Sequence, residues 1–309
     1  MSDTEKKTKK RRKAGSKIDL KNHLNERVLF IVDVNRLAST EFVSLETENR
    51  TKKPSHSAII NDEVYNTSIL YELFRRMLKV PLNSVDYAFA FDTPTNGIKA
   101  FNYRYGNGLV LEDNEYYGQI NALRYVLKSS RFTVLEQDGY EAYNLIDKCV
   151  KDNYDYYDKI FIFTIDRVLY PLVDQKVNIV VNQSVKDDIT PFTYEDALGV
   201  PYNLLQLKQC VVGDPKLSTK GVRLVGPKKF VQMIQRDNLL RIIPNSLTTK
   251  ELIMQSKFLS EKQKIEALDE LSWLLRRDGT YCDTRILKGN QTTLNSYLEL
   301  FGLQKFIER

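Results

Sequence analysis

Three aspartates follow short, mostly apolar runs, at the positions where buried strands would end. The runs and their aspartates are 29–32 before Asp33, 85–91 before Asp92, and 160–165 before Asp166. Unbroken apolar runs of this length are typical of strands buried on both faces of a parallel sheet. The carboxyl ends of such strands meet at one edge, where ligands bind in open α/β folds. We therefore predict an α/β protein with a central, mostly parallel, twisted sheet flanked by helices.

Three converging carboxylates would have the chemistry of a metal site. Grouped negative charges repel one another unless a cation lies among them, and oxygen ligands suit a hard divalent ion such as Mg²⁺. The alternative for each aspartate is a turn or a helix N-cap. A histidine base or a zinc site is not expected, because His23 and His56 are the only histidines in the chain.

The composition is that of an ordinary globular protein, with 42% hydrophobic and 28% charged residues over 309 positions. No apolar run approaches the roughly 20 residues of a membrane span, and the N-terminus lacks the apolar core of a signal peptide. Cys149, Cys210 and Cys282 are far apart in sequence, so we expect buried thiols in a reducing compartment. These features predict a cytoplasmic protein with no membrane partner.

The net charge of +6 is concentrated at the start of the chain. Residues 1–17 hold eight Lys and Arg against Asp3 and Glu5, which leaves the rest of the chain neutral. Such a run predicts a disordered basic tail over about 1–24. The tail is either a solubilising segment or a loose, salt-sensitive contact with nucleic acid.

Beyond the tail, the chain divides into two regions. Residues 25–183 carry the predicted strands, and residues 184–309 are mostly helical in pattern. Further patterns predict a loop over 44–62, helices over 67–79 and 140–151, a short helix over 169–173, and strands over 132–135 and 177–181.

The segment over about 100–128 is unusually rich in aromatic side chains. Aromatic rings mixed with arginine suit stacking on bases and contact with phosphates, but the same tyrosines could equally belong to the core. The residues in question are Phe101, Tyr103, Arg104, Tyr105, Tyr116, Tyr117 and Tyr125.

A second segment with binding chemistry is the glycine-bounded turn over 221–226, which precedes a predicted helix with Pro227 at its start. Backbone N–H groups at such a turn and helix N-terminus can hold a phosphate, helped by the flanking Lys220, Lys228 and Lys229. The alternative is an ordinary helical hairpin.

The order of these motifs resembles that of the structure-specific 5′ nuclease superfamily, which includes flap endonucleases, phage RNase H and the 5′-exonuclease domain of bacterial DNA polymerase I. The resemblance covers about residues 27–309 and is of a phage-like size. It implies a PIN-like 5′-nuclease fold with a helical arch near 100–128 and a C-terminal helix–three-turn–helix motif. The matching segments are Ile31 to Asn35, Phe91-Asp92, Tyr103-Arg104, Gly139 to Asn144, Thr164 to Val168, Gly199 to Pro201, Val212 to Leu217, Gly226 to Lys228, and Leu294 to Arg309.

The resemblance also implies roles for individual side chains. The implied catalytic residues are Asp33, Asp92, Glu141, Asp166 and Asp214. The implied ligands of a first metal ion are Asp33, Asp92, Glu141 and Asp166. The implied nucleic-acid contacts are Tyr103, Arg104, Lys220, Arg223, Gly226, Lys228 and Lys229.

Departures from the family pattern remove much of the expected negative charge. Carboxylates of the family are replaced here by Tyr143, Asn144, Val168 and Leu217. The hairpin also differs, with Arg223 and Leu224 where proline and glycine are usual. We therefore expect the second metal site to be lost and one Mg²⁺ or Mn²⁺ at most to bind.

The resemblance and its departures together predict a protein that binds branched or 5′-ended nucleic acid, of flap or RNA-primer type, with weak or absent phosphodiester hydrolysis. Its setting would be phage DNA replication or repair in the bacterial cytoplasm, on DNA or RNA–DNA. One alternative is an active Mg²⁺-dependent 5′-3′ exonuclease, flap endonuclease or RNase H, with Asp187 or Asp188 supplying a missing ligand. Another is a non-catalytic subunit that binds a replication or transcription protein.

Overall fold

The computed structural model describes residues 26–38, 56–60, 62–77, 85–92, 114–138, 140–181, 190, 200–217, 219–241, 247–274 and 282–307. Several expectations fall outside these residues. They are the basic tail over 1–24, the nucleic-acid contacts Tyr103 and Arg104, and the substitute ligands Asp187 and Asp188.

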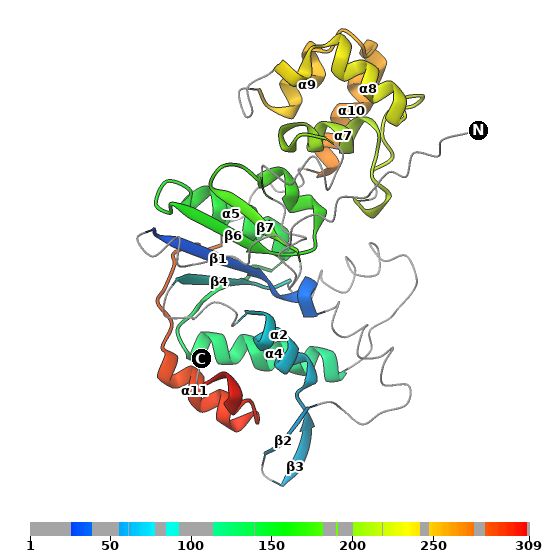
Figure 1. Ribbon diagram of the computed structural model, residues 1–309. Helices are drawn as coiled ribbons and strands as arrows, with labels where there is room; N and C mark the ends of the chain where they lie inside the picture. The colour runs from blue at the N-terminus through cyan, green and yellow to red at the C-terminus, as the bar shows by residue number, and fades with distance from the viewer. Residues whose placement is uncertain are drawn as a thin grey trace, which may run out of the picture.

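A five-stranded parallel sheet forms the centre of the molecule (Figure 1). Its strand order is β5-β4-β1-β6-β7. After β1, the chain first adds β4 and β5 on one side of it, and then β6 and β7 on the other. The prediction of a parallel sheet is confirmed, and the reversal of direction lies between β1 and β6. The strands are β1 (Val28–Asp33), β4 (Asp86–Ala90), β5 (Thr133–Leu135), β6 (Lys159–Phe163) and β7 (Val177–Val180).

Each face of the sheet is covered by its own hydrophobic cluster. On β1, Leu29 and Ile31 belong to the cluster that includes helix α5 (Ala142–Asn153), whereas Phe30 and Val32 belong to the opposite one. Every residue of β1 is buried, which explains why its sequence shows no polar alternation. The opposite cluster contains helices α2 (Ser68–Met77), α4 (Asn114–Ser129) and α11 (Gln291–Leu300).

Helix α4 accounts for the second half of the aromatic segment predicted over 100–128. Tyr116 is buried in the core, so for this residue the core alternative is correct and stacking on a base is excluded. Tyr125 is exposed and packs edge-to-face against Tyr297 of α11. Residues 100–113 lie outside the described part of the chain.

The region from residue 200 to residue 274 is helical, as predicted, and packs against the α5 side of the sheet (Figure 1). Helix α9 starts with a capping box, in which Thr248 and Glu251 satisfy each other's backbone N–H groups. The described elements are η4 (Tyr202–Leu204), α7 (Leu205–Val211), η5 (Pro215–Leu217), α8 (Pro227–Arg236), η6 (Leu239–Arg241), α9 (Thr249–Gln255) and α10 (Glu261–Leu274).

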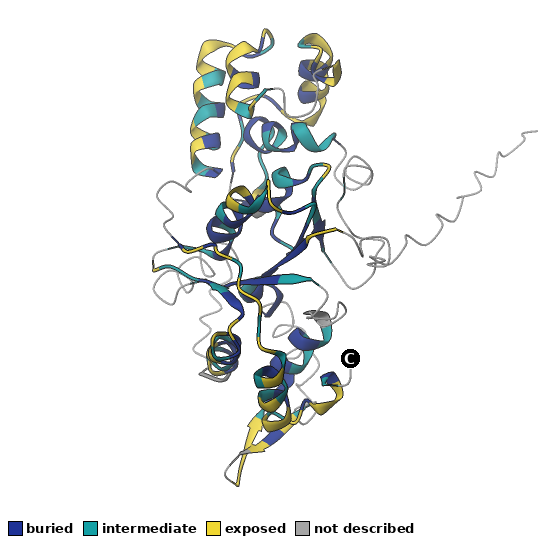
Figure 2. Ribbon diagram, turned by 90° about the vertical axis from the view of Figure 1, so that its left-hand side faces the viewer, coloured by how far each residue is buried: buried dark blue, intermediate teal, exposed yellow. Residues whose placement is uncertain are grey.

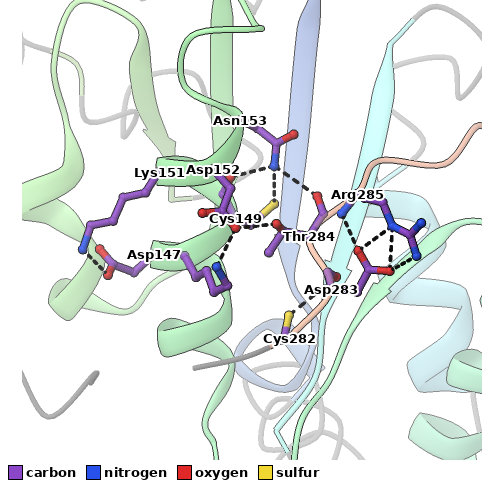
Figure 3. Close-up of polar contacts among 10 residues, drawn as sticks. Asp147, Cys149, Lys151, Asp152, Asn153, Cys282, Asp283, Thr284 and Arg285 are labelled. Carbon is purple, nitrogen blue, oxygen red and sulfur yellow. Dashed lines mark hydrogen bonds and ion pairs between the residues drawn. The ribbon is translucent and has the colours of Figure 1, made fainter. Parts of the chain in front are cut away.

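The end of the chain returns to the sheet through an extended segment over 282–290, which is pinned to α5 (Figure 3). Asp152 accepts a hydrogen bond of 2.6 Å from the Thr284 hydroxyl, and Asn153 donates one of 3.1 Å to the Thr284 carbonyl oxygen. Leu294 and Leu298 of α11 are then buried beside α4. The last helix therefore packs on the α/β core and not with the preceding helices.

One predicted loop contains structure that the sequence pattern did not indicate. Strands β2 (Ser57–Ile60) and β3 (Glu63–Asn66) form an antiparallel hairpin, so the loop prediction over 44–62 is wrong for its last residues. Ile59 and Val64 pair across the hairpin and are both more than 70% exposed. The hairpin is the mostly exposed pair of strands at the lower end of Figure 2. Because the hairpin protrudes from the core, its sequence lacks the alternation that marks a half-buried strand.

The other predicted elements are confirmed with small shifts of their ends. Helix α2 corresponds to the helix over 67–79, α5 to that over 140–151, and η2 (Arg167–Leu172) to the short helix over 169–173. The three cysteines are free and buried, as expected. Among the described helices, none has the length and apolar character needed to cross a membrane.

Candidate active site at the carboxyl edge of the sheet

Asp33 and Asp166 meet at the carboxyl edge of the sheet, between β1 and β6. Asp33 is the last residue of β1, and Asp166 follows β6 by three residues; both are at most 3% exposed. Thr164 joins them, because its hydroxyl donates to an Asp33 carboxylate oxygen at 2.7 Å and accepts from the Asp166 backbone N–H at 2.9 Å. This position is the topological switch point, where α/β proteins commonly bind ligands.

Asp92 reaches the same edge from β4. One of its carboxylate oxygens accepts a 2.6 Å hydrogen bond from the backbone N–H of Ala142, at the first turn of α5. Its own backbone N–H donates to the side chain of Asn35 at 3.0 Å. Glu141 is the N-cap residue of α5 and is partly buried. The structure therefore brings Asp33, Asp92 and Asp166 together. Glu141 lies beside Asp92, because it directly precedes Ala142, whose backbone N–H donates to Asp92.

The electrostatics of Asp33 show that this edge carries concentrated negative charge. Burial and the neighbouring charges of Asp92 and Asp166 raise the pKa of Asp33 to about 7. The hydrogen bond from Thr164 and the positive charge of Arg36 act in the opposite direction but are smaller. Without a cation, the Asp33 carboxyl is thus harder to ionise than that of an ordinary aspartate.

Two arginines that sequence reasoning missed lie at this edge. A guanidinium nitrogen of Arg36 is 3.5 Å from an Asp166 carboxylate oxygen, and one of Arg167 is 3.4 Å from an Asp214 carboxylate oxygen. The signal in the sequence was their position, because Arg36 follows Asp33 by three residues and Arg167 follows Asp166 directly. Fixed guanidinium charges therefore stand beside two carboxylates that the resemblance assigns to catalysis.

The positions where the family pattern has further carboxylates are apolar or already packed. Val168 and Leu217 are each 8% exposed and belong to the hydrophobic cluster that includes α5. Asn144 is buried, and Tyr143 packs against the same cluster. The Val168 backbone N–H also donates to Asp166 at 3.0 Å. Among the residues that the structure describes, these four positions supply no second set of carboxylates.

The fit of a metal ion can be judged from the donors that are present. The oxygens of Asp33, Asp92 and Asp166 suit a hard cation. However, no group of three or more His, Cys, Asp or Glu in the described part of the chain is arranged so that it could hold a metal ion. The arrangement therefore does not fit a preformed two-ion centre.

The glycine-bounded turn over 221–226 forms part of a tight helical hairpin before α8. Gly213 and Gly221 both have positive φ angles, and Asp214 pairs with Thr219 across the loop between them. A Cβ on Gly221 would lie 2.5 Å from the backbone of Val212, so only glycine fits. Leu224, which replaces a usual glycine, also has a positive φ of 65°.

The backbone of this hairpin is already engaged by carboxylates of α10. The N–H of Lys220 donates to Glu270 at 3.2 Å, and the N–H of Arg223 donates to Glu266 at 3.0 Å. A phosphate at these two amides would have to displace the carboxylates, and the predicted phosphate contact stays a prediction. Gly226 caps α8 without a side-chain hydrogen bond, and Pro227 and Lys228 after it are exposed. The exposed basic residues are Lys220, Arg223, Lys228 and Lys229.

With this sheet order and these strand ends, the chain has the α/β fold of the structure-specific 5′ nucleases. It superimposes on the bacteriophage T5 5′-exonuclease with bound zinc at a TM-score of 0.54, with 15% identity, covering 91% of this chain and 97% of that one. A bacteriophage T5 flap endonuclease, solved as a pseudo-enzyme–product complex with DNA and metal ions, gives a TM-score of 0.54 at 16% identity, covering 92% and 100%.

The sequence is similar to bacterial DNA polymerase I. It is 24% identical to that of Deinococcus radiodurans over 251 residues, which cover 80% of this chain and 25% of the relative. It is 26% identical to that of Mycobacterium tuberculosis over 225 residues, which cover 71% and 24%. The chain thus spans about a quarter of the length of the curated relatives it matches. No protein-family model matches it.

Proposed function

We propose that this chain binds branched or 5′-ended nucleic acid, as a flap or RNA primer, and hydrolyses phosphodiesters weakly or not at all. The observation that carries the proposal is the state of the second metal position. Asp214 there is paired with Arg167, and Val168 and Leu217 are buried apolar residues. The setting we propose is phage DNA replication or repair.

The loss of hydrolysis follows from the chemistry of phosphodiester cleavage with two metal ions. Such sites hold the attacking and the leaving oxygen between ions about 3.5–4 Å apart. Removal of one electrostatic stabiliser of a developing charge costs roughly 3–4 kcal/mol, which is about a hundred- to a thousand-fold in rate. One Mg²⁺ or Mn²⁺ at most would bind, near Asp33, Asp92, Glu141 and Asp166, and would supply only part of the charge stabilisation.

Binding would depend on the exposed positive charges around the start of α8. Lys220, Arg223, Lys228 and Lys229 are exposed, and the uncapped N-terminus of α8 begins at Gly226. Phosphates are attracted both by such charges and by the N–H groups of a helix N-terminus. Tyr103 and Arg104 would add contacts to the same nucleic-acid strand.

The direct test is incubation of the full chain with a 5′-flap substrate and Mg²⁺ or Mn²⁺, with binding measured in parallel by gel shift at low salt. We expect retained binding of flaps with cleavage at least about a hundred-fold below that of a two-metal enzyme. An absence of binding to flaps, single strands and duplexes would contradict the nucleic-acid proposal.

An active enzyme is the second candidate, and it is favoured by the convergence of Asp33, Asp92 and Asp166 at the switch point. The same assay separates the two candidates. Robust cleavage by the wild-type chain that disappears in Asp33→Ala would establish activity at this edge. Cleavage that persists in Asp33→Ala would indicate a contaminating nuclease.

A further inference from the structure

A cavity of about 480 Å³ that is open to solvent lies beside β5. Three of its lining side chains are basic and three are apolar. They are Lys128, Arg131, Phe132, Val134, Leu287 and Lys288. Because it is open on one side, a ligand in it would remain partly in contact with solvent.

The register of the sheet places this cavity at the opposite end from the candidate active site. Ala90 of β4 pairs with both Asp33 and Leu135, so Leu135 is at the carboxyl edge. Phe132 precedes β5 at the amino edge, where α4 ends and the segment over 282–290 crosses (Figure 1). A ligand in the cavity would therefore not share the metal site.

Arg131 occupies a strained backbone position at the end of α4. The N–H of Phe132 donates to the Leu127 carbonyl oxygen at 3.0 Å, and that of Arg131 donates to Lys128 at 2.9 Å. These two bonds form a Schellman motif, whose left-handed residue is usually glycine. Arg131 has a φ of 58°. An arginine here is less stable than glycine would be.

The opposite wall of the cavity is held in place by hydrogen bonds. The N–H of Leu287 donates to the Thr133 hydroxyl at 2.6 Å, and the N–H of Asn290 donates to the Ser130 carbonyl oxygen at 2.6 Å. Gly289 lies so close to Phe132 that a Cβ would meet its ring at 2.2 Å. The walls are thus formed before any ligand binds.

The positive charges of the cavity are only partly neutralised. Lys128 forms an ion pair with Glu136. In the part of the chain that the structure describes, neither Arg131 nor Lys288 has a carboxylate partner, and both are exposed. Basic side chains at a pocket with an apolar floor suit a ligand that combines a doubly charged anion with a flat apolar group.

We propose that this cavity binds a phosphate-bearing ligand of nucleotide type, with Arg131 and Lys288 on the phosphate and Phe132, Val134 and Leu287 against the base. The nucleotide is either free or the terminal residue of a strand. Aromatic and apolar side chains hold bases with little sequence preference. The site is independent of the proposed function at the carboxylate edge, and failure of one leaves the other intact.

The test is calorimetric titration of the full chain with thymidine 5′-monophosphate, thymidine and inorganic phosphate, each at low salt. We expect the monophosphate to bind at least about tenfold more tightly than either fragment, since only it uses both parts of the cavity. Oligothymidylates with a 5′-phosphate or a 5′-hydroxyl distinguish a free nucleotide from a strand end. Tighter binding of the phosphorylated strand than of the monophosphate would identify the strand end.

The matched variants are Arg131→Gly and Lys288→Gln, with Lys151→Gln on the surface of α5 as the control. Arg131→Gly relieves the left-handed strain, so its melting temperature should equal or exceed that of the wild type while nucleotide affinity falls about tenfold or more. Lys288→Gln should lower the nucleotide affinity by a similar factor, and Lys151→Gln should leave the nucleotide affinity unchanged. Equal affinity in all variants, or stronger binding of an acidic peptide than of the monophosphate, would overturn the proposal.

Discussion

Arg167 lies with a guanidinium nitrogen 3.4 Å from a carboxylate oxygen of Asp214, so an ion pair joins the carboxyl edge of the sheet to the helical hairpin. Arg167 begins η2 directly after Asp166, and Asp214 precedes η5. A divalent ion at Asp214 would have to compete with this fixed positive charge. Under the proposed function, this pair opposes the binding of a second metal ion at Asp214.

Arg167→Gln should therefore raise the affinity of the chain for Mn²⁺ severalfold, because it removes a positive charge near the carboxylates. Hydrolysis should not appear, since Val168 and Leu217 still provide no ligands. Titration followed by electron paramagnetic resonance measures the free ion. Arg285→Gln, which breaks an exposed pair with Asp283, serves as the control. Equal Mn²⁺ affinity in both variants would show that Arg167 does not oppose metal binding.

The melting temperature of Val168→Asp should depend on whether a metal ion is present. Val168 is 8% exposed beside Asp166, so a carboxylate there is unfavourable unless a cation neutralises it. We expect a melting temperature well below that of the wild type in EDTA and recovery with Mn²⁺. The neutral Val168→Asn should be destabilised without recovery. If Mn²⁺ stabilises both variants alike, Val168 does not lie at a metal position.

The pKa of Asp33 predicts a pH dependence of stability in the metal-free protein. Its folded value of about 7 lies above the unfolded value of about 4, so this group favours folding fully below pH 4 and loses that contribution as the pH rises through 7. Asp33→Asn removes the titration. It should be more stable than the wild type by roughly 2–4 kcal/mol at pH 8 in EDTA, with the difference vanishing near pH 4.

Denaturant unfolding at several pH values measures this effect. Asp158→Asn is a suitable control, because a hydrogen bond from Arg27 lowers the pKa of the exposed Asp158. That variant should not gain stability at pH 8. A difference between Asp33→Asn and wild type that is the same at pH 4 and pH 8 would contradict the assigned pKa.

Glu266→Gln tests whether carboxylates of α10 oppose nucleic-acid binding at the hairpin. The amide oxygen can still accept the hydrogen bond from the Arg223 N–H, while one negative charge is lost. We expect flap affinity to rise about two- to fivefold at low salt, and the gain to shrink as salt screens the charges.

The opposite change is Lys228→Gln with Lys229→Gln, which should weaken binding and lower the salt slope by about one per residue. Gel shifts over a range of salt concentrations measure both effects, with Lys151→Gln as the control. An unchanged salt slope in the double variant would exclude α8 from the nucleic-acid interface.

Gly221→Ala should disrupt the hairpin, whereas Gly226→Ala should be tolerated. The first needs a positive φ and places a Cβ 2.5 Å from the Val212 backbone; the second has nothing within 4 Å of its Cβ. We expect a loss of roughly 2–3 kcal/mol in unfolding free energy for Gly221→Ala and less than about 0.5 kcal/mol for Gly226→Ala. Similar losses in the two variants would mean that the hairpin backbone differs from that described.

Much of this protein is determined by local sequence. Apolar runs come before Asp33, Asp92 and Asp166. They indicate buried parallel strands, because a strand that is covered on both faces carries apolar side chains at nearly every position. Parallel strands then place those aspartates at one edge without further information. The glycine-bounded turn is also indicated by the sequence. Glycine is the residue that most easily adopts a left-handed backbone, as Gly213 and Gly221 do.

The tertiary structure decided which side chains the carboxylates of the candidate site contact. Neither the pairing of Arg36 with Asp166 nor that of Arg167 with Asp214 could be read from the sequence, because side-chain direction depends on how η2 and the hairpin pack. The same holds for Glu266, which reaches the hairpin backbone from 43 residues away in sequence. Charge pairing acts through space, and separation along the chain does not fix separation in space. Local pattern therefore predicted the strands of the central sheet, and the fold alone assigned the partners of their carboxylates.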